Sequence, residues 1–206
     1  MNNRKAQILK RSFDISLSVF LLIILFIPGL LLTLILAGYF RENPFFQQKR
    51  IGQNAQEFVL YKFRSIKGDI PISMAGTHLQ ISGISKWTLK YKLNELPQLV
   101  NILIGDMSFV GPRPDVKGFA DKLKGEDRII LEVKPGLTGP ATLKYRNELS
   151  MLSKQSNPEV FNREIIWPDK VKINRNYIEN WSFIKDIQIL LKTLFPFLSF
   201  FNSRLQ

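Results

Sequence analysis

The chain has 206 residues, with 29 Lys plus Arg against 17 Asp plus Glu, so its formal net charge at pH 7 is +12. This length predicts one domain, because domains typically contain about 100–200 residues. There is no cysteine and a single histidine, His78, which excludes disulfide frameworks, thiolate sites and multi-histidine zinc sites. A metal ion in this chain would be a hard cation held by carboxylates, such as Mg²⁺.

The N-terminal part of the chain contains a long apolar segment. Residues 15–40 include no charged side chain, and as a straight helix they would extend about 39 Å at about 1.5 Å per residue. This exceeds the hydrocarbon core of a bilayer, which is about 30 Å thick. The segment lacks the short apolar region and the small-residue cleavage site of a signal peptide. We therefore expect residues 1–40 to remain in the mature protein as a membrane anchor.

Two topologies compete for this anchor: a helix that spans the bilayer, and a re-entrant helix that enters and returns. Both flanks are basic, so the positive-inside rule gives no clear orientation, and a re-entrant helix accounts for this better. Pro28, followed by Gly29, also lies in the middle of the segment, where a proline bends a helix. Spanning helices tolerate proline too, so the residues alone leave both topologies open. The flanking cations are Arg4, Lys5, Lys10 and Arg11 before the segment and Arg41, Lys49 and Arg50 after it.

Residues 45–63 predict a β-hairpin. The runs 45–48 and 58–63 are rich in residues that favour strands, and Gly52-Gln53-Asn54 between them favours a turn. The residues that follow, 67–85, are rich in Gly and Ser and predict a loop.

Residues 94–103 predict a helix. Asn94 is a good N-cap residue, Pro97 would fall in the first turn, where proline is tolerated, and Gly105 would end the helix.

The C-terminal third is helical in pattern. Apolar residues recur at helical spacing from Phe183 to Leu194, with Lys185 and Lys192 between them, and residues 195–201 are strongly aromatic. A basic, aromatic, amphipathic helix in an anchored chain is typical of a helix lying on the membrane surface, although an ordinary core helix would show the same spacing. Together the segments predict an α+β fold, mostly helical, with a re-entrant membrane helix, a small β-hairpin and amphipathic interfacial helices.

Cations and carboxylates gather among turn-forming residues in the middle of the chain. Unpaired N–H groups and the helix dipole make helix N-termini phosphate-binding, and arginine forks fit phosphate oxygens. A basic site with a carboxylate at a helix start therefore suits a phosphate-bearing substrate. The same cations would also attract anionic lipid, by about 1 kcal/mol each near a membrane surface, so charge alone does not decide. The residues are Lys62, Arg64, Lys90, Lys92, Arg113, Glu95 and Asp106.

Four sequence blocks favour a phosphate-bearing substrate over simple attraction to anionic lipid. They are residues 44–52 (PFFQQKRIG), 61–65 (YKFRS), 93–101 (LNELPQLVN) continued by 105–114 (GDMSFVGPRP), and 134–139 (KPGLTG). In this order, behind an apolar N-terminal segment, they resemble the bacterial sugar transferase family, the monotopic phosphoglycosyl transferases. The resemblance runs from residues 10–14 (KRSFD) to about Thr193.

The resemblance implies an activity. Members transfer a phosphosugar from a nucleotide diphosphate sugar, usually a UDP-sugar, to polyprenyl phosphate and release UMP, as the first membrane step of surface glycan assembly. It also implies Mg²⁺, an Asp-Glu pair whose Asp attacks phosphorus to form a covalent intermediate, and a re-entrant helix bent at a proline. Residues 41–206 are then a catalytic region on the cytoplasmic face of the bacterial inner membrane, in contact with its lipid, and a homodimer is a further expectation.

The sequence departs from the family pattern at the reacting position. The family reads Asp-Glu-Leu-Pro-Gln where this chain has Asn94 before Glu95, and an amide lacks the charge needed to attack phosphorus and bind metal. Either Glu95 replaces the nucleophile, or the position is an engineered substitution, or the chain is a natural variant that binds without turnover. Leu89 stands where relatives commonly have Arg, a loss for which Lys90 and Lys92 would compensate.

The resemblance assigns roles to particular residues. Asn94 occupies the nucleophile position, and Glu95 binds the metal and serves as base or substitute nucleophile. Asp106 is a second metal ligand, with a turn-stabilising role as the alternative. The phosphate ligands are Lys62, Arg64, Lys90 and Arg113, for which a salt bridge (Arg113) and simple exposure (Lys62) are the alternatives, and Tyr145 and Arg146 face the nucleotide sugar.

Two other functions are considered. A non-catalytic, membrane-anchored relative that binds substrate or acts as a scaffold is favoured by Asn94. A nucleic-acid binder is suggested by the +12 charge, but no nucleic-acid-binding module is recognisable and the anchor places the charge at a membrane, so we expect no nucleic-acid partner.

Overall fold

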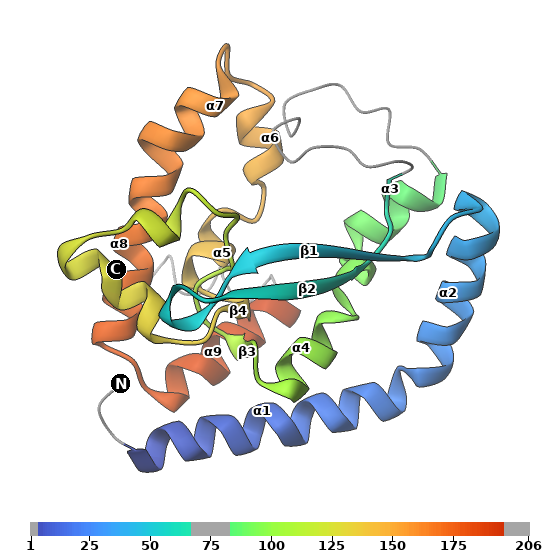
Figure 1. The fold of residues 1–206 in the computed structure, drawn as a ribbon, viewed down its shortest axis with the longest axis horizontal. Coiled ribbons are helices and arrows are strands. Elements are labelled where there is room, and N and C mark those ends of the chain that lie inside the picture. The colour runs from blue at the N-terminus through green and yellow to red at the C-terminus, as the bar shows by residue number, and fades with distance from the viewer. Residues whose placement is uncertain (1–3, 67–82, 196–206) are drawn as a thin grey trace.

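The computed structural model describes residues 4–66 and 83–195. A bent pair of N-terminal helices borders two adjacent sides of the α+β body that the rest of the described chain forms (Figure 1). The α+β class and the mainly helical content are therefore confirmed. His78, most of the predicted loop 67–85 and the aromatic tail beyond Phe195 lie outside the described residues, and the division at residue 40 stays a prediction.

The two N-terminal helices are α1, Arg4–Ile24, and α2, Phe26–Phe40, with a bend of 62° between them. Pro28 has no N–H to donate to the carbonyl of Ile24, four residues earlier, and its ring crowds that carbonyl. The helix breaks at Leu25, next to that carbonyl. The predicted proline bend is confirmed.

The helix pair is largely apolar on its surface. No single helix among the described residues is both long and apolar enough to cross a bilayer, but α1 and α2 meet that criterion as one bent pair. Leu32, Leu36 and Phe40 are the buried residues of α2 and pack against Phe63. The exposed apolar residues of the pair include Phe20, Ile23, Phe26, Ile27, Leu31, Leu34 and Ile35.

The first half of α1 is fixed to the body by charged residues. The Lys10 ammonium donates to the carboxylate of Asp186 (2.5 Å) and to the carbonyl of Val110 (2.9 Å). One turn later, the Asp14 carboxylate accepts from the backbone N–H of Phe109 at 3.1 Å. The KRSFD block is therefore a buried attachment between the anchor and the body.

Arg11 makes a further attachment to the C-terminal end of a body helix, α4 (Gln98–Ile104). Its guanidinium donates to the carbonyls of Ile102 (2.6 Å) and Leu103 (2.7 Å). The last carbonyls of a helix have no partner within the helix, so an arginine satisfies two of them here.

The predicted β-hairpin is confirmed. Strand β1, Phe45–Ile51, pairs antiparallel with β2, Glu57–Phe63, through a short 3₁₀ turn, η1, Gln53–Ala55. Cross-strand pairing sets Phe46 opposite Lys62 and Arg50 opposite Phe58. Because side chains alternate between the two faces of a strand, Arg50 and Lys62 belong to the same face.

The predicted helix 94–103 is two elements. After α3, Gly83–Lys90, a 3₁₀ turn, η3, covers Leu93–Glu95, and α4 begins only at Gln98. Lys92 precedes the turn in the left-handed conformation (φ 58°), and Pro97, which cannot donate a backbone hydrogen bond, separates the turn from α4. Asn94 lies inside the turn, so the prediction that it is an N-cap is wrong. Gly105 ends α4 as predicted, at φ 102°.

A small parallel sheet joins two of the sequence blocks, residues 105–114 and 134–139. Strand β3, Ser108–Val110, pairs with β4, Gly136–Thr138. The Gly111 N–H donates to Thr138 (2.9 Å), and the Gly136 N–H donates to Pro112 (2.8 Å). A Cβ at Gly136 would lie 2.1 Å from the nitrogen of Gly111, so only glycine permits this approach. The loop that carries Arg113 is thereby fixed.

The C-terminal half supplies short helical segments and two longer helices. The core beneath the hairpin includes Ile102, Met107, Val110 and Ile178. The segments are η4 (Ala120–Lys122), η5 (Gly125–Glu132), α5 (Pro140–Lys144), α6 (Glu148–Leu152), α7 (Pro158–Phe161), η6 (Asn162–Ile166), α8 (Trp167–Glu179) and α9 (Phe183–Leu194).

Helix α9 combines the two alternatives left open by its sequence. Ser182 caps its N-terminus by accepting from the backbone N–H of Lys185. Ile189 packs in the core, whereas Ile184 and Leu194 are 69% and 70% exposed. One face of α9 therefore packs in the core, and the other exposes apolar side chains to the surroundings, as the α1–α2 anchor also does.

Candidate active site

A cluster of charges forms where η3, the hairpin and the loop after β3 meet. The Arg113 guanidinium donates to the Glu95 carboxylate at 2.7 Å. Lys62 and Lys92 act on the same carboxylate electrostatically. Two predicted site residues, Lys62 and Arg113, are thus brought to Glu95 by segments about thirty and twenty residues away in the chain.

Glu95 is held in its ionised form. Burial alone would raise the pKa of its carboxyl, but the charge and hydrogen bond of Arg113, with Lys62 and Lys92, outweigh burial and keep the pKa below its ordinary value. Arg113 responds in the opposite direction: the Glu95 charge raises the pKa of its guanidinium. The pair is therefore a carboxylate and a guanidinium at neutral pH.

Lys62 is the least satisfied cation of the cluster. Burial, together with the charge of Arg113, lowers the pKa of its ammonium to about 8. Among the described residues, the Lys62 side chain has no hydrogen-bond or ion-pair partner. A half-buried ammonium with three donors and no partner is suited to an anionic ligand.

Arg50 extends the basic face of the hairpin. Its guanidinium donates to the Gln48 side chain (3.0 and 2.6 Å) and to the carbonyl of Pro114 (3.1 Å). Burial and the neighbouring Arg113 lower its pKa to about 10, so it remains charged at neutral pH. Burial raises the pKa of the nearby Asp115 carboxyl to about 7, against the opposing charges of Lys170 and Arg50.

Asn94 has an unsatisfied oxygen beside this cluster. The residue is 8% exposed, and its side-chain oxygen, Oδ1, is buried without a hydrogen-bond partner in the described part of the chain. An orphaned buried acceptor costs about 1–3 kcal/mol. Such an atom next to a carboxylate is the kind of group that a bound ligand or cation satisfies.

The oxygens of Asn94 and Glu95 fit a shared cation better than a dedicated metal centre. Among the described residues, no three His, Cys, Asp or Glu side chains gather to hold an ion by themselves. Mg²⁺ commonly takes one or two protein oxygens and completes its shell with water and substrate phosphates. The donor set therefore fits Mg²⁺ that arrives with a phosphate ligand.

Asp106 does not join Glu95. The two residues lie beyond opposite ends of the seven-residue helix α4, which is about 10 Å long at about 1.5 Å per residue. The Asp106 carboxylate instead accepts from the amide of Asn101 at 3.3 Å, and its charge acts on Lys134. This position agrees with the turn-stabilising alternative and gives no support to a metal site shared with Glu95.

Arg64 and Lys90 also point to other partners. The Arg64 guanidinium donates to the carbonyl of Asn43 (2.9 Å) and pairs with Glu42 (3.2 Å), which ties the exit of α2 to the end of β2. The Lys90 ammonium lies 5.3 Å from the ring centre of Tyr91. Arg64 follows the last residue of β2, and these contacts direct it toward the segment after α2 rather than toward Glu95.

Tyr145 and Arg146 are engaged with the C-terminal helices. The Tyr145 hydroxyl donates to Asp169 at 2.6 Å, and burial with this contact raises the pKa of Tyr145 to about 12. Arg146 donates to the carbonyls of Lys192 (3.4 Å) and Thr193 (2.9 Å) near the end of α9. Arg146 therefore secures α9, and Tyr145 reaches the site only through a neighbour, Lys170.

Several charged residues in or beside the cluster were missed from the sequence. Arg50 could have been assigned, because it shares a strand face with the predicted Lys62. Asp115, Glu148 and Lys170 carry no local signal: they come from distant elements and are recognised only by their charges around Arg113.

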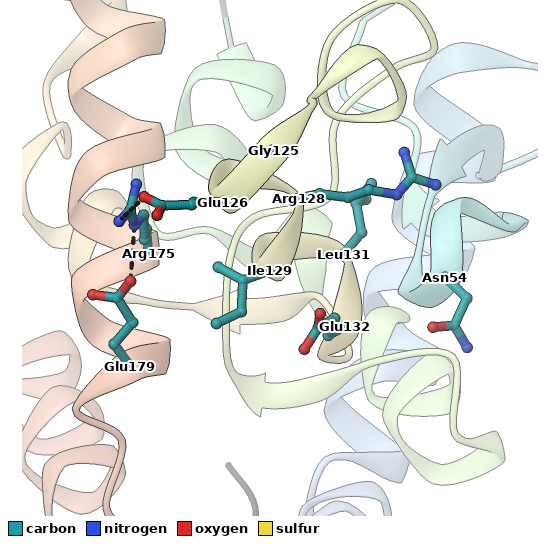
Figure 2. A pocket seen from close by; sticks show the side chains of 9 residues that line it. All are labelled: Asn54, Gly125, Glu126, Arg128, Ile129, Leu131, Glu132, Arg175 and Glu179. Carbon is teal, nitrogen blue, oxygen red and sulfur yellow. Dashed lines mark hydrogen bonds and ion pairs between the residues drawn. The ribbon is translucent and has the colours of Figure 1, made fainter.

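A separate open cavity of about 570 Å³ lies between η5 and α8 (Figure 2). Its charged residues are largely paired with each other, since Arg175 binds Glu126 (2.5 Å) and Glu179 (2.8 Å). It is lined by Asn54, Gly125, Glu126, Arg128, Ile129, Leu131, Glu132, Arg175 and Glu179. None of the predicted site residues belongs to it, so it has no part in the chemistry of the Glu95 cluster.

Residues 5–199 match the model of the family described as bacterial sugar transferase. The chain belongs to this family. A sugar transferase of Bacillus subtilis, named as uncharacterized (EpsL), is 32% identical over 190 residues, which cover 91% of this chain and 86% of that protein. The exopolysaccharide production protein ExoY of Rhizobium meliloti is 31% identical, over 90% of this chain and 83% of that protein.

Longer relatives share the same region. The undecaprenyl-phosphate galactose phosphotransferase of Salmonella typhimurium is 29% identical over 211 residues, which are 92% of this chain but 40% of that protein. The similarity therefore covers nearly all of this chain, including every member of the Glu95 cluster, and confirms the family inferred from the four sequence blocks.

Proposed function

We propose that this chain transfers a sugar phosphate from a UDP-sugar to polyprenyl phosphate and releases UMP, at the cytoplasmic face of the bacterial inner membrane. The observation that carries the proposal is the Glu95–Arg113 pair (2.7 Å) with Lys62 beside it, an ammonium that has no partner within the described ranges 4–66 and 83–195. Relatives of this chain include proteins named as undecaprenyl-phosphate phosphotransferases of galactose and glucose.

The cations suit a diphosphate. Arg113 has one donor in the Glu95 contact and further N–H groups available, and Lys62 offers three. Arg50 adds a third positive charge close by, fixed by Gln48. We infer that the donor diphosphate binds across Lys62, Arg113 and Arg50, with its scissile phosphorus facing Asn94 and Glu95.

Glu95 and Asn94 are the residues that would hold a Mg²⁺ ion shared with this diphosphate. When bound, the ion would neutralise part of the phosphate charge and so favour attack by an anionic acceptor. The chain's own contribution is to keep Glu95 ionised through Arg113 and to place an amide oxygen, Asn94 Oδ1, next to it.

Residue 94 limits the reaction in this proposal. A neutral amide cannot attack phosphorus, and the Glu95 oxygen that accepts from Arg113 is a weakened nucleophile because the hydrogen bond engages its lone pair. We therefore expect slow turnover in the unaltered chain. The same observation favours the second candidate, a membrane-anchored relative that binds the substrates without transferring the phosphosugar.

A radiolabelled UDP-sugar panel with polyprenyl phosphate separates the two candidates. The unaltered chain, Asn94→Asp and Glu95→Gln are compared at equal amounts, and lipid-linked label is measured. The transferase proposal predicts low turnover in the unaltered chain, a large gain in Asn94→Asp and none in Glu95→Gln. Binding of UDP-sugars without turnover in the unaltered chain and in Asn94→Asp would establish the binding relative instead.

The membrane placement is part of the proposal. Both flanks of the α1–α2 pair are basic, and the 62° bend would return the chain to the side it entered. The chain has no native cysteine, so single cysteines at Asn3 and Asn43 report each flank cleanly. Both should resist a membrane-impermeant thiol reagent in intact cells and react after permeabilisation. Labelling of either from outside would demonstrate a spanning helix.

A further inference from the structure

Arg113 is shared by two groups of charges. One group contains Glu95 and Lys62, and we call it the phosphate side because the donor diphosphate is proposed to bind there. The other contains Asp115 and Glu148, whose carboxylates also act on the Arg113 charge. Asp115 also acts on the charge of Arg50, so the second group borders the cations of the phosphate side.

The centre of the second group is an ion pair between two helices. The ammonium of Lys170, on α8, donates to both oxygens of Glu148, the first residue of α6, at 2.7 Å each. The side chains remain partly accessible, 19% for Lys170 and 27% for Glu148. The Lys170 charge also acts on Asp115, which joins the pair to the loop that carries Arg113.

This pair retains hydrogen-bonding capacity. An ammonium has three donors, of which Lys170 uses two, and each carboxylate oxygen of Glu148 has a further lone pair. The pair is also fixed in place. Lys170 lies 5.6 Å from the ring centre of Tyr145, and the hydroxyl of that tyrosine is held by Asp169.

The chemistry of the second group differs from that of the phosphate side. Its charges largely cancel, so it offers little attraction to a phosphate. A fixed carboxylate that accepts, next to an ammonium that donates, is suited to neutral hydroxyl groups. A UDP-sugar has such a neutral, hydroxyl-rich part directly attached to its diphosphate.

We propose that Glu148 and Lys170 form the subsite that binds the hydroxyl groups of the donor sugar. The inference rests on the proposed function, since it takes the ligand of the phosphate side to be a UDP-sugar. It assigns to these two residues the additional affinity of the chain for a UDP-sugar over UDP. The competing explanation is that the pair only fastens α6 to α8.

The test compares binding of UDP with binding of UDP-glucose, UDP-galactose and their N-acetylamino counterparts to the full chain in detergent, by calorimetry. We expect the unaltered chain to bind at least one UDP-sugar more tightly than UDP. Glu148→Gln should reduce that preference roughly ten-fold or more, because it removes a charge-assisted acceptor, and leave the affinity for UDP within about two-fold. Glu179→Gln, which alters another ion-paired carboxylate outside the cluster, should change neither.

A charge swap separates recognition from fastening. Glu148→Lys combined with Lys170→Glu preserves an ion pair, so its melting temperature should exceed that of Glu148→Lys alone, while the sugar preference stays lost. Recovery of the preference in the swap, an unchanged preference in Glu148→Gln, an equal loss of UDP and UDP-sugar affinity, or no preference in the unaltered chain would each overturn the subsite. Failure of the unaltered chain to bind UDP and every UDP-sugar would instead overturn the proposed donor, and the subsite with it.

Discussion

Two clusters of charged residues in this molecule differ in how far their polar groups are satisfied. Around Asp186, which is 2% exposed, the carboxylate accepts from Lys10 (2.5 Å), Tyr177 (2.5 Å) and Trp181 (3.1 Å). Around Glu95, the part of the chain that the structure describes supplies one direct side-chain contact, from Arg113. Both clusters are buried or half-buried and both join distant segments, but only the first satisfies its polar groups within the chain.

The difference indicates which cluster is structural and which awaits a ligand. Buried polar groups in folded proteins almost always have partners, so an oxygen without one calls for an explanation. Asn94 Oδ1 is such an oxygen, and Lys62 is a cation without a partner among the described residues. A bound phosphate and its cation would satisfy both, whereas nothing further is needed at Asp186.

The largest expected effect is on stability, at the satisfied cluster. Lys10→Met leaves the Asp186 carboxylate buried without its counter-charge, and we expect a loss of about 3–5 kcal/mol in the free energy of unfolding. Lys10→Met combined with Asp186→Asn removes both charges and should recover part of this loss. Chemical denaturation in detergent measures both variants. A loss below about 1 kcal/mol in Lys10→Met would mean that the network is not a structural attachment.

The next effect is on ligand affinity, at the unsatisfied cluster. Arg113→Ala removes a charge-assisted, fork-shaped donor and should weaken UDP-sugar binding roughly ten- to a hundred-fold. Arg113→Lys keeps the charge without the fork-shaped donor, so its UDP-sugar affinity should lie between that of the unaltered chain and that of Arg113→Ala. Calorimetry provides the affinities, and Arg175→Ala, which disrupts the ion pairs of the separate cavity, is the matched control. Unchanged affinity in Arg113→Ala would make that arginine structural.

The smallest effect is a pH dependence. The pKa of Lys62 is lowered to about 8 in the folded chain. Its side chain is therefore mostly protonated below pH 8 and loses its positive charge as the pH rises through that value. UDP affinity should therefore fall from pH 7 to pH 9. Lys62→Arg, which stays charged, should abolish the decline. A profile that is the same in both proteins would show that Lys62 does not bind the phosphate.

The same residue gives an opposite dependence for stability. Because the pKa of Lys62 is lower in the folded chain than the ordinary 10.5, the unfolded chain binds more protons between about pH 8 and 10.5. Stability should rise with pH across this window in the absence of ligand, while UDP affinity falls. Lys62→Met should lose both dependences.

Much of the fold follows from local pattern. The bend near Pro28, the hairpin at residues 45–63 and the end of a helix at Gly105 each depend on residues close in sequence. The β3–β4 pairing was not predictable, because it joins segments far apart, and neither Gly111 nor Gly136 reveals the other. The N-cap expected at Asn94 failed because Lys92 adopts a left-handed conformation and Pro97 interrupts the helix.

The site was predictable only in part, for a related reason. Glu95, Lys62 and Arg113 lie in sequence blocks whose residue types suit phosphate, and the structure brings them together. Arg64 and Arg146 have the same chemistry but bind carbonyls or carboxylates elsewhere, and sequence does not disclose such partners. Tertiary packing decides which cations bind other groups of the chain and which remain available to a phosphate.

The central claim is that the unsatisfied oxygen at residue 94 marks the point where the phosphosugar is attacked. Intact-mass and peptide mass spectrometry of the unaltered chain and of Asn94→Asp, each incubated with Mg²⁺ and the UDP-sugar that binds, tests it most directly. We expect a phosphosugar adduct on the new carboxylate of Asn94→Asp, released on addition of polyprenyl phosphate, and no adduct on the unaltered chain. An adduct on Glu95 in the unaltered chain, or robust turnover by both proteins without any adduct, would contradict the claim.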